Sequence, residues 1–339
     1  MTSEIFARSK RRKILKVWWG VCTLLAVPFT LYASSPASEQ SERMGLSPQS
    51  LLLDIAVLDT GIVVVGERGH ILISSDGGGS WRQIIAPTRA ALTNVYFADE
   101  RHGWASGHSG VVLSTSDGGD SWKLVSEPDP EISYFDSLFF DERNGFLVGA
   151  YGEFSKTDDA ATSLENIRID EEELHFYSLE QSPNGTLFLV GENGQIFRSS
   201  DKARTWRKLN SPYEGSLFGI LCLDDETLLT FGLRGHLFRS ADAGNTWTQV
   251  EIGSEAMLTA GIRLSSNKLV ISSVSDLVFM SSDEGHTFYE VAQLGIDGTV
   301  ALAEAANDQT VVFCGRHGVT SVETSVLETA FQKAQSADE

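Results

Sequence analysis

A short stretch of sequence that returns about every 41 residues constrains this chain more than any other feature. It begins with a Gly-x-x-Gly turn at Gly66 and continues into an Asp box, a Ser-x-Asp-x-Gly-x-Ser-Trp pattern that holds Asp76 and Trp81. The same pair of signals returns at Gly107 and Asp117. A period in the forties with several short strands in each unit is typical of β-propeller blades.

Counting the returns gives seven units. The predicted box aspartates are Asp76, Asp117, Asp158, Asp201, Asp242 and Asp283. The first turn glycine is present in every unit except the sixth, where Ser273 replaces it. No long linker separates the units, so we predict one all-β domain, a seven-bladed propeller over residues 38–330, with four short strands in each blade.

The seventh unit lacks a box aspartate, and its fourth strand is weak. Ring closure is therefore expected to recruit a strand, because closure removes the open sheet edges that invite aggregation. Two sources stay open from the sequence: residues near Met44 to Ser47, or Val326 to Phe331. Residues 331–339 are predicted to form a disordered tail.

The first 37 residues predict export. Four consecutive basic residues, 10–13, precede an apolar run from Val17 to Tyr32, and small residues follow up to Ala37. This order is typical of a secretory signal peptide, while a retained membrane anchor over residues 14–32 is the alternative. Both place the rest of the chain outside the cytoplasm, in a periplasm or a lumen.

Charge excludes one class of partner. Without residues 1–37, the chain keeps 20 basic and 45 acidic residues. A surface this acidic repels phosphate backbones, so we expect no nucleic-acid partner. The sequence has no His/Cys cluster at metal-ligand spacing, and its Gly-x-x-Gly turns open hairpins rather than helices. We therefore predict no metal and no cofactor.

The Asp box is expected to be structural. Its carboxylate can accept hydrogen bonds from the N–H groups of its own tight turn. The box tryptophans can place a large apolar face between neighbouring sheets. These residues are Trp81, Trp122, Trp206 and Trp247. No catalytic residue is predicted.

Hairpin geometry separates the loops by face. The Asp boxes and the first turn of each blade share one face, and the Gly-x-x-Gly turns share the other with the connections between blades. We take the second face as the candidate binding surface, although its residues would equally suit ordinary turns. The candidates are Arg68, His108, Tyr151, Asn193, Arg234, Arg316 and His317.

The repeated pattern resembles the photosystem II stability/assembly factor family, and in particular its relatives in non-photosynthetic bacteria. The segments Gly66 to Trp81 and Gly107 to Trp122 match the family pattern closely, and the resemblance extends over about residues 45–325. It implies an exported propeller without chemistry of its own that binds a membrane protein complex. In non-photosynthetic relatives it implies an association with envelope transporters of the RND type.

Two alternatives belong to other functional classes, because Asp boxes also occur in other secreted propellers. One is a sialidase-like glycoside hydrolase, which would need an arginine cluster and a Tyr–Glu nucleophile pair. The sialidase signature Arg-Ile-Pro is absent, and sialidases are normally six-bladed. The other is a glycan-binding lectin. The oligomeric state is left open.

Overall fold

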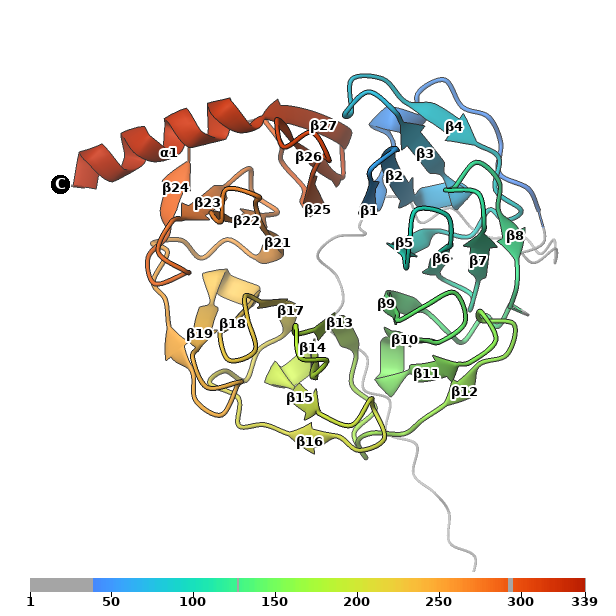
Figure 1. The fold of residues 1–339 in the computed structure, drawn as a ribbon, viewed down its shortest axis with the longest axis horizontal. Helices are drawn as coiled ribbons and strands as arrows, with labels where there is room; N and C mark the ends of the chain where they lie inside the picture. The colour runs from blue at the N-terminus through green and yellow to red at the C-terminus, as the bar shows by residue number, and fades with distance from the viewer. Residues whose placement is uncertain (1–38, 127, 292–294, 339) are drawn as a thin grey trace, which may run out of the picture. The chain divides into compact units, whose positions relative to one another are not determined.

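The structure of the protein, a computed structural model, describes residues 39–126, 128–291 and 295–338. These residues form seven antiparallel sheets arranged as blades around a centre (Figure 1). The predicted seven-bladed propeller is therefore confirmed. The predicted signal or anchor, residues 1–37, lies outside the described residues. Within those residues, no helix is both long and apolar enough to cross a membrane.

Each blade is a meander that runs outward from the centre. The first strands are β1 (Leu52–Leu58), β5 (Leu92–Phe97), β9 (Tyr134–Phe139), β13 (Phe176–Gln181), β17 (Leu217–Cys222), β21 (Leu258–Arg263) and β25 (Thr299–Glu304). The second strands are β2 (Gly61–Gly66), β6 (Gly103–Gly107), β10 (Gly145–Gly149), β14 (Leu187–Gly191), β18 (Leu228–Gly232), β22 (Leu269–Ser273) and β26 (Thr310–Gly315).

The outer strands are shorter. The third strands are β3 (Ile71–Ser74), β7 (Val112–Thr115), β11 (Phe154–Thr157), β15 (Ile196–Ser199), β19 (Leu237–Ser240), β23 (Val278–Ser281) and β27 (Gly318–Glu323). The fourth strands are β4 (Arg82–Ile84), β8 (Lys123–Leu124), β12 (Glu165–Asn166), β16 (Arg207–Lys208), β20 (Thr248–Gln249) and β24 (Tyr289–Val291). Short 3-10 helices lie at Ser47–Gln49, Glu67–Gly69, Ala150–Gly152, Glu192–Gly194 and Leu233–Gly235.

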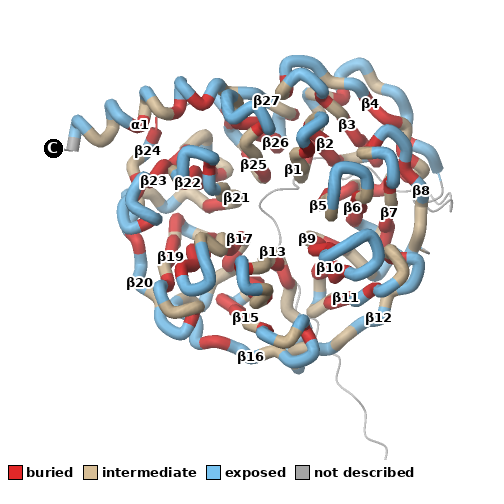
Figure 2. The backbone as a smooth tube through the Cα atoms, viewed as in Figure 1, coloured by how far each residue is buried: buried red, intermediate tan, exposed pale blue. Residues whose placement is uncertain are grey.

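The core lies between neighbouring blades. The second strands are buried along almost their whole length (Figure 2), because both faces of each sheet pack against another sheet. Val63 of β2 and Leu113 of β7, for example, belong to one apolar cluster. Apolar side chains from adjacent blades thus supply most of the hydrophobic stabilisation of the ring.

Ring closure differs from both expected routes. The seventh sheet has three strands among the described residues, and it meets the first blade through side chains. Val312 and Cys314 of β26 pack against Ile62 and Val64 of β2 in one buried cluster. The Ser321 hydroxyl also donates a hydrogen bond of 3.0 Å to the carbonyl of Gly78 in the first Asp box.

Neither proposed closing strand forms. Residues near Met44 instead follow the outer edge of the first blade, where the Met44 N–H donates to Gln83 Oε1 at 2.8 Å. The chain after β27 turns into helix α1 (Thr324–Asp338), so the predictions of a strand over 326–331 and of a disordered tail over 331–339 are wrong. Leu327 and Phe331 lie one turn apart and are buried, with the Phe331 ring 5.9 Å from that of Tyr289. This apolar pair fixes the helix against the sixth blade.

Candidate functional site

Backbone hydrogen bonds divide the turns between the two faces as predicted. On one face, the Asp-box turn contacts the first turn of its own blade, as the Gly118 N–H donates to Arg101 O at 3.1 Å. On the other face, the Gly-x-x-Gly turn contacts the connection from the preceding blade, as the His108 N–H donates to Ala91 O at 3.0 Å. The two halves of the repeated stretch therefore lie on opposite faces of the ring.

The Asp-box carboxylates accept hydrogen bonds from residues of their own turns. Asp76 accepts hydrogen bonds from the Ser80 hydroxyl at 2.6 Å, the Ser80 N–H at 2.8 Å and the Ser74 hydroxyl at 2.7 Å. The Ser74 oxygen in turn accepts the Gly78 N–H at 2.8 Å. The Ser80 hydroxyl contributes most to lowering the pKa of Asp76 to about 2. The same bonds recur at Asp117, Asp201, Asp242 and Asp283.

The third box is shifted by one residue from its predicted place. Asp159, not Asp158, accepts the Ser163 hydroxyl at 2.7 Å, the Ser163 N–H at 2.8 Å and the Thr157 hydroxyl at 3.0 Å. The geometry requires the aspartate two residues after the hydroxyl of the third strand, and only Asp159 meets that requirement. The spacing between boxes then becomes regular, because the interval before this box and the interval after it are both 42 residues.

The box tryptophans pack between sheets. Trp122 is buried, and its Nε1–H donates to Gly119 O at 2.9 Å. Trp81 lies in the cluster between the seventh and first blades. Trp206 and Trp247 pack against their own and neighbouring blades in the same way. In the sixth blade Phe288 takes this place and is buried.

The Gly-x-x-Gly candidates are all exposed. They are Arg68, His108, Tyr151, Asn193, Arg234, Arg316 and His317. Their blades place them around the circumference of one face, and only the last two share a blade. Whether they bind a ligand stays a prediction.

The turn conformation explains its glycines. In most blades the third position has a positive φ, as at Arg234 with 56°, and the following glycine has one too. A Cβ on Gly235 would lie 1.9 Å from Ser254 O, so no side chain fits there. The sixth blade differs because the Ser273 hydroxyl accepts the N–H groups of Ser275 and Leu277, and its positive φ moves to Asp276.

A cavity at the centre of the ring was not predicted. It has a volume of about 250 Å³, and the first strands of all seven blades line it. Three aromatic residues of successive blades form one side of it: Phe135, Tyr177 and Phe218. The ring centroids of Phe135 and Tyr177 are 5.9 Å apart, and those of Tyr177 and Phe218 are 5.1 Å apart.

The aromatic side of the cavity continues to the outer surface of the Gly-x-x-Gly face. The His175 ring lies 6.0 Å from Phe135 and 4.9 Å from Tyr151. Tyr151 is 68% exposed, and its N–H donates to His175 Nδ1 at 2.9 Å. One predicted candidate, Tyr151, is therefore connected by ring contacts to the central cavity.

The acidic side of the cavity contains Asp54 and Asp136, which bridge neighbouring blades. Asp54 accepts the Val95 N–H at 2.8 Å, and Asp136 accepts the Leu179 N–H at 2.8 Å. Asn94 Nδ2 lies between the two carboxyls, 3.0 Å from one and 3.1 Å from the other. Each aspartate directly follows a bulge in the first strand of its blade, and burial raises the pKa of both to about 7.

Glu180 is a third carboxyl in the same cavity. Burial, and secondly the charge of Asp136, raise the pKa of Glu180 to about 8. No described residue donates a hydrogen bond to its carboxyl. The sequence offers a weak signal for part of this cluster, since Asp54, Asn94 and Asp136 recur at almost one repeat length in strand positions rather than in turns.

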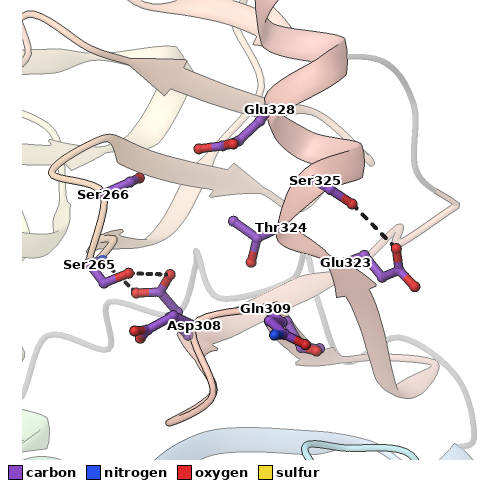
Figure 3. A pocket seen from close by; sticks show the side chains of 10 residues that line it. Ser265, Ser266, Asp308, Gln309, Glu323, Thr324, Ser325 and Glu328 are labelled. Carbon is purple, nitrogen blue, oxygen red and sulfur yellow. Dashed lines mark hydrogen bonds between the residues drawn. The ribbon is translucent and has the colours of Figure 1, made fainter.

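A second cavity of about 500 Å³, lined by polar and acidic residues, lies on the opposite face, between turns of the last two blades and the start of α1 (Figure 3). Its three glutamates have partners among the described residues. Glu304 accepts the Ser265 N–H at 2.6 Å, and Glu328 pairs with Lys268 at 2.5 Å. No group of three or more Asp, Glu, His or Cys side chains suited to a metal ion occurs among the residues that the structure describes.

Comparison with known proteins places the chain in a family. Its sequence matches the family described as photosynthesis system II assembly factor YCF48 over residues 33–127, 79–206 and 126–295. No curated protein matches it.

Solved structures share the fold. One described as YCF48 bound to D1 peptide is 18% identical, with a TM-score of 0.67, over 86% of this chain and 98% of its own. YCF48 from Cyanidioschyzon merolae is 16% identical, with a TM-score of 0.64, over 80% and 95%. A streptogramin B lyase is 12% identical, with a TM-score of 0.71, over 85% and 99%. At these identities the structures establish the propeller fold, and the family match, which spans more than half of the chain, establishes that the chain belongs to the photosystem II assembly factor YCF48 family.

Proposed function

We propose that this protein is an exported, non-enzymatic assembly or accessory factor that holds a membrane protein on its Gly-x-x-Gly face. The family match supports a protein-binding scaffold or assembly factor. A solved relative is described as bound to a D1 peptide, which supports a peptide segment as the bound element. If the protein comes from a cell without photosystems, its membrane partner would be an envelope transporter of the RND type.

The single observation that carries the choice of face is the series of ring contacts from the exposed Tyr151 to the central cavity. Tyr151 is one of four exposed large apolar or aromatic side chains among the described residues. Tyrosine is enriched in protein interfaces because it offers a large contact area with little conformational entropy to lose. Its neighbour His175 holds the Tyr151 backbone, so this side chain is presented from a fixed turn.

The glycosidase alternative has less support. Its candidate pair would be Tyr151 and Glu153, but Glu153 accepts hydrogen bonds from Ser155 at 2.5 Å and Asn166 at 2.8 Å, away from the central cavity. Because a streptogramin B lyase has a similar fold, enzymatic activity should be assayed. Turnover of aryl sialosides or other aryl glycosides would contradict the scaffold, and selective binding on a glycan array would support a lectin.

Site-specific photocrosslinking tests the proposal. A benzoylphenylalanine placed at Tyr151 should crosslink to an integral membrane protein in intact cells. The matched control is Phe140, which lies in the first turn of the same blade on the opposite face and is 39% exposed. A crosslink from both positions, or from neither, would contradict the choice of face.

Export needs a separate test. External protease should degrade the full chain in spheroplasts while a cytoplasmic marker survives. Comparing the mass of the mature chain with that of residues 38–339 would decide between a cleaved signal and a retained anchor. Protection of the chain until the cells are lysed would contradict export.

A further inference from the structure

The central cavity combines three features that do not serve the fold alone. It presents an arc of aromatic rings, from Phe135 through Phe218, and three carboxyls. None of its lining residues is Lys, Arg or His. Any charge that its side chains carry is therefore negative.

The three carboxyls differ in the number of hydrogen bonds that they accept. Asp54 and Asp136 each accept backbone N–H groups and share Asn94. Glu180 has no hydrogen-bond donor among the described residues, and Asp136 repels its charge. Glu180 is half-buried, and a polar group withdrawn from water without a partner is costly, so an N–H donor with a positive charge would complete this position.

The aromatic rings favour the same kind of ligand. A cation is attracted to the face of a phenylalanine or tyrosine ring within about 6 Å of its centre. Proteins that recognise quaternary ammonium ligands do so with cages of aromatic rings. The cavity volume of about 250 Å³ is smaller than a typical small-molecule site of about 300–1,000 Å³ and suits a single side chain.

We propose that the central cavity is a socket for one alkylammonium or guanidinium group, supplied by a lysine or arginine side chain of the bound partner. The source of the group rests on the proposed function, whereas the socket itself does not. The aromatic path through His175 leads from the cavity to Tyr151 on the proposed binding face. The net charge of −20 would also attract a basic segment.

Binding of small probes to the full chain tests the socket. Butylammonium and butylguanidinium chloride should shift the ¹³C carboxyl resonance of Glu180, whereas 1-butanol and pentanoate should leave it unchanged. Glu180→Gln should weaken binding of both cations about 10-fold, because a bound cation can pair with a Glu180 carboxylate but not with an uncharged amide. Tyr177→Leu should weaken it about 3-fold through loss of a ring face.

The matched control is Glu255→Gln, which removes an exposed carboxyl from a connection on the same face, outside the cavity. It should change cation binding less than about 2-fold, as expected for a solvated charge. Circular dichroism confirms that each variant is folded. Equal binding of 1-butanol, or unchanged cation binding by Glu180→Gln, would overturn the socket.

Two peptides identify the source of the cation. Gly-Gly-Lys-Gly-Gly should bind, and the same peptide with norleucine in place of lysine should not. If butylammonium binds and the lysine peptide does not, the ligand is a free amine and the side-chain assignment is overturned. If both bind while Tyr151 gives no membrane-protein crosslink, the socket stands and the proposed function fails. If Tyr151 gives the crosslink and neither cation binds, the proposed function stands and the socket is overturned.

Discussion

Replacing Glu180 with glutamine should make this protein more stable, although the substitution removes a charged residue from the centre of the ring. The carboxyl has a pKa of about 8 in the folded protein against an ordinary value of 4.5. Because the folded pKa is the higher one, the folded chain binds a proton that the unfolded chain has released at neutral pH. The contribution of Glu180 to the stability of the wild type is therefore fully present below about pH 4.5 and is lost as the pH rises through about 8.

The magnitude follows from the size of that shift. Each pKa unit corresponds to about 1.4 kcal/mol, so at about pH 7 the full effect would be about 3 kcal/mol. Part of the Glu180 side chain remains accessible from the cavity, which reduces the expected gain for Glu180→Gln to about 2 kcal/mol. Between about pH 6 and about pH 9, the advantage of the variant should increase by about 2 kcal/mol.

Urea denaturation at several pH values measures this difference. Asp136, Tyr96 and Cys222 also contribute to the electrostatics around Glu180 and remain in the variant, so some pH dependence persists in both proteins. Glu255→Gln, at an exposed position, should change stability by less than about 0.5 kcal/mol. A glutamine variant that is less stable than the wild type at about pH 8 would refute the reasoning, since it would mean that Glu180 is stabilised as a charge.

Three further substitutions test the fold in urea denaturation. Asp159→Ala should cost about 1–2 kcal/mol through lost turn hydrogen bonds, while Asp158→Ala should cost less than about 0.5; equal effects would contradict the shifted box. Phe331→Ala should cost about 3 kcal/mol by opening a cavity under α1, and a neutral result would mean that the helix does not pack as described. Gly235→Ala and Gly253→Ala both introduce a side chain at a φ of 69°. Only the first clashes with a carbonyl, so it should cost at least about 1 kcal/mol more.

Much of this architecture could be predicted because the repeat is carried by turns. Turns require particular residues at fixed offsets, so Gly66 and Asp76 identify a blade and its two faces without any knowledge of packing. The third box shows the limit of that approach. Asp158 and Asp159 are adjacent, and only the hydrogen-bond register of the third strand decides between them.

The features that the sequence did not reveal depend on contacts between distant segments. The cavity carboxyls lie within strands, where Asp54 and Asp136 carry only the weak periodic signal noted above and Glu180 carries none. Their proximity results from the packing of consecutive blades around the centre. The helix at the C-terminus was missed for a similar reason, because Leu327 and Phe331 become a recognisable apolar pair only when the surface of the sixth blade is available to them.

The closure between the last and first blades has a mechanical consequence. In the described residues no strand is shared across this boundary, so no ladder of backbone hydrogen bonds joins the two ends of the ring. The boundary is held by side-chain packing around Val312 and Ile62, by the bond from Ser321 to Gly78, and by the contact of Pro48 with Gly318 at the start of β27. A pulling force that separates β1 from β27 would therefore open the ring at this boundary first, and the blades would then detach one at a time from the two exposed ends.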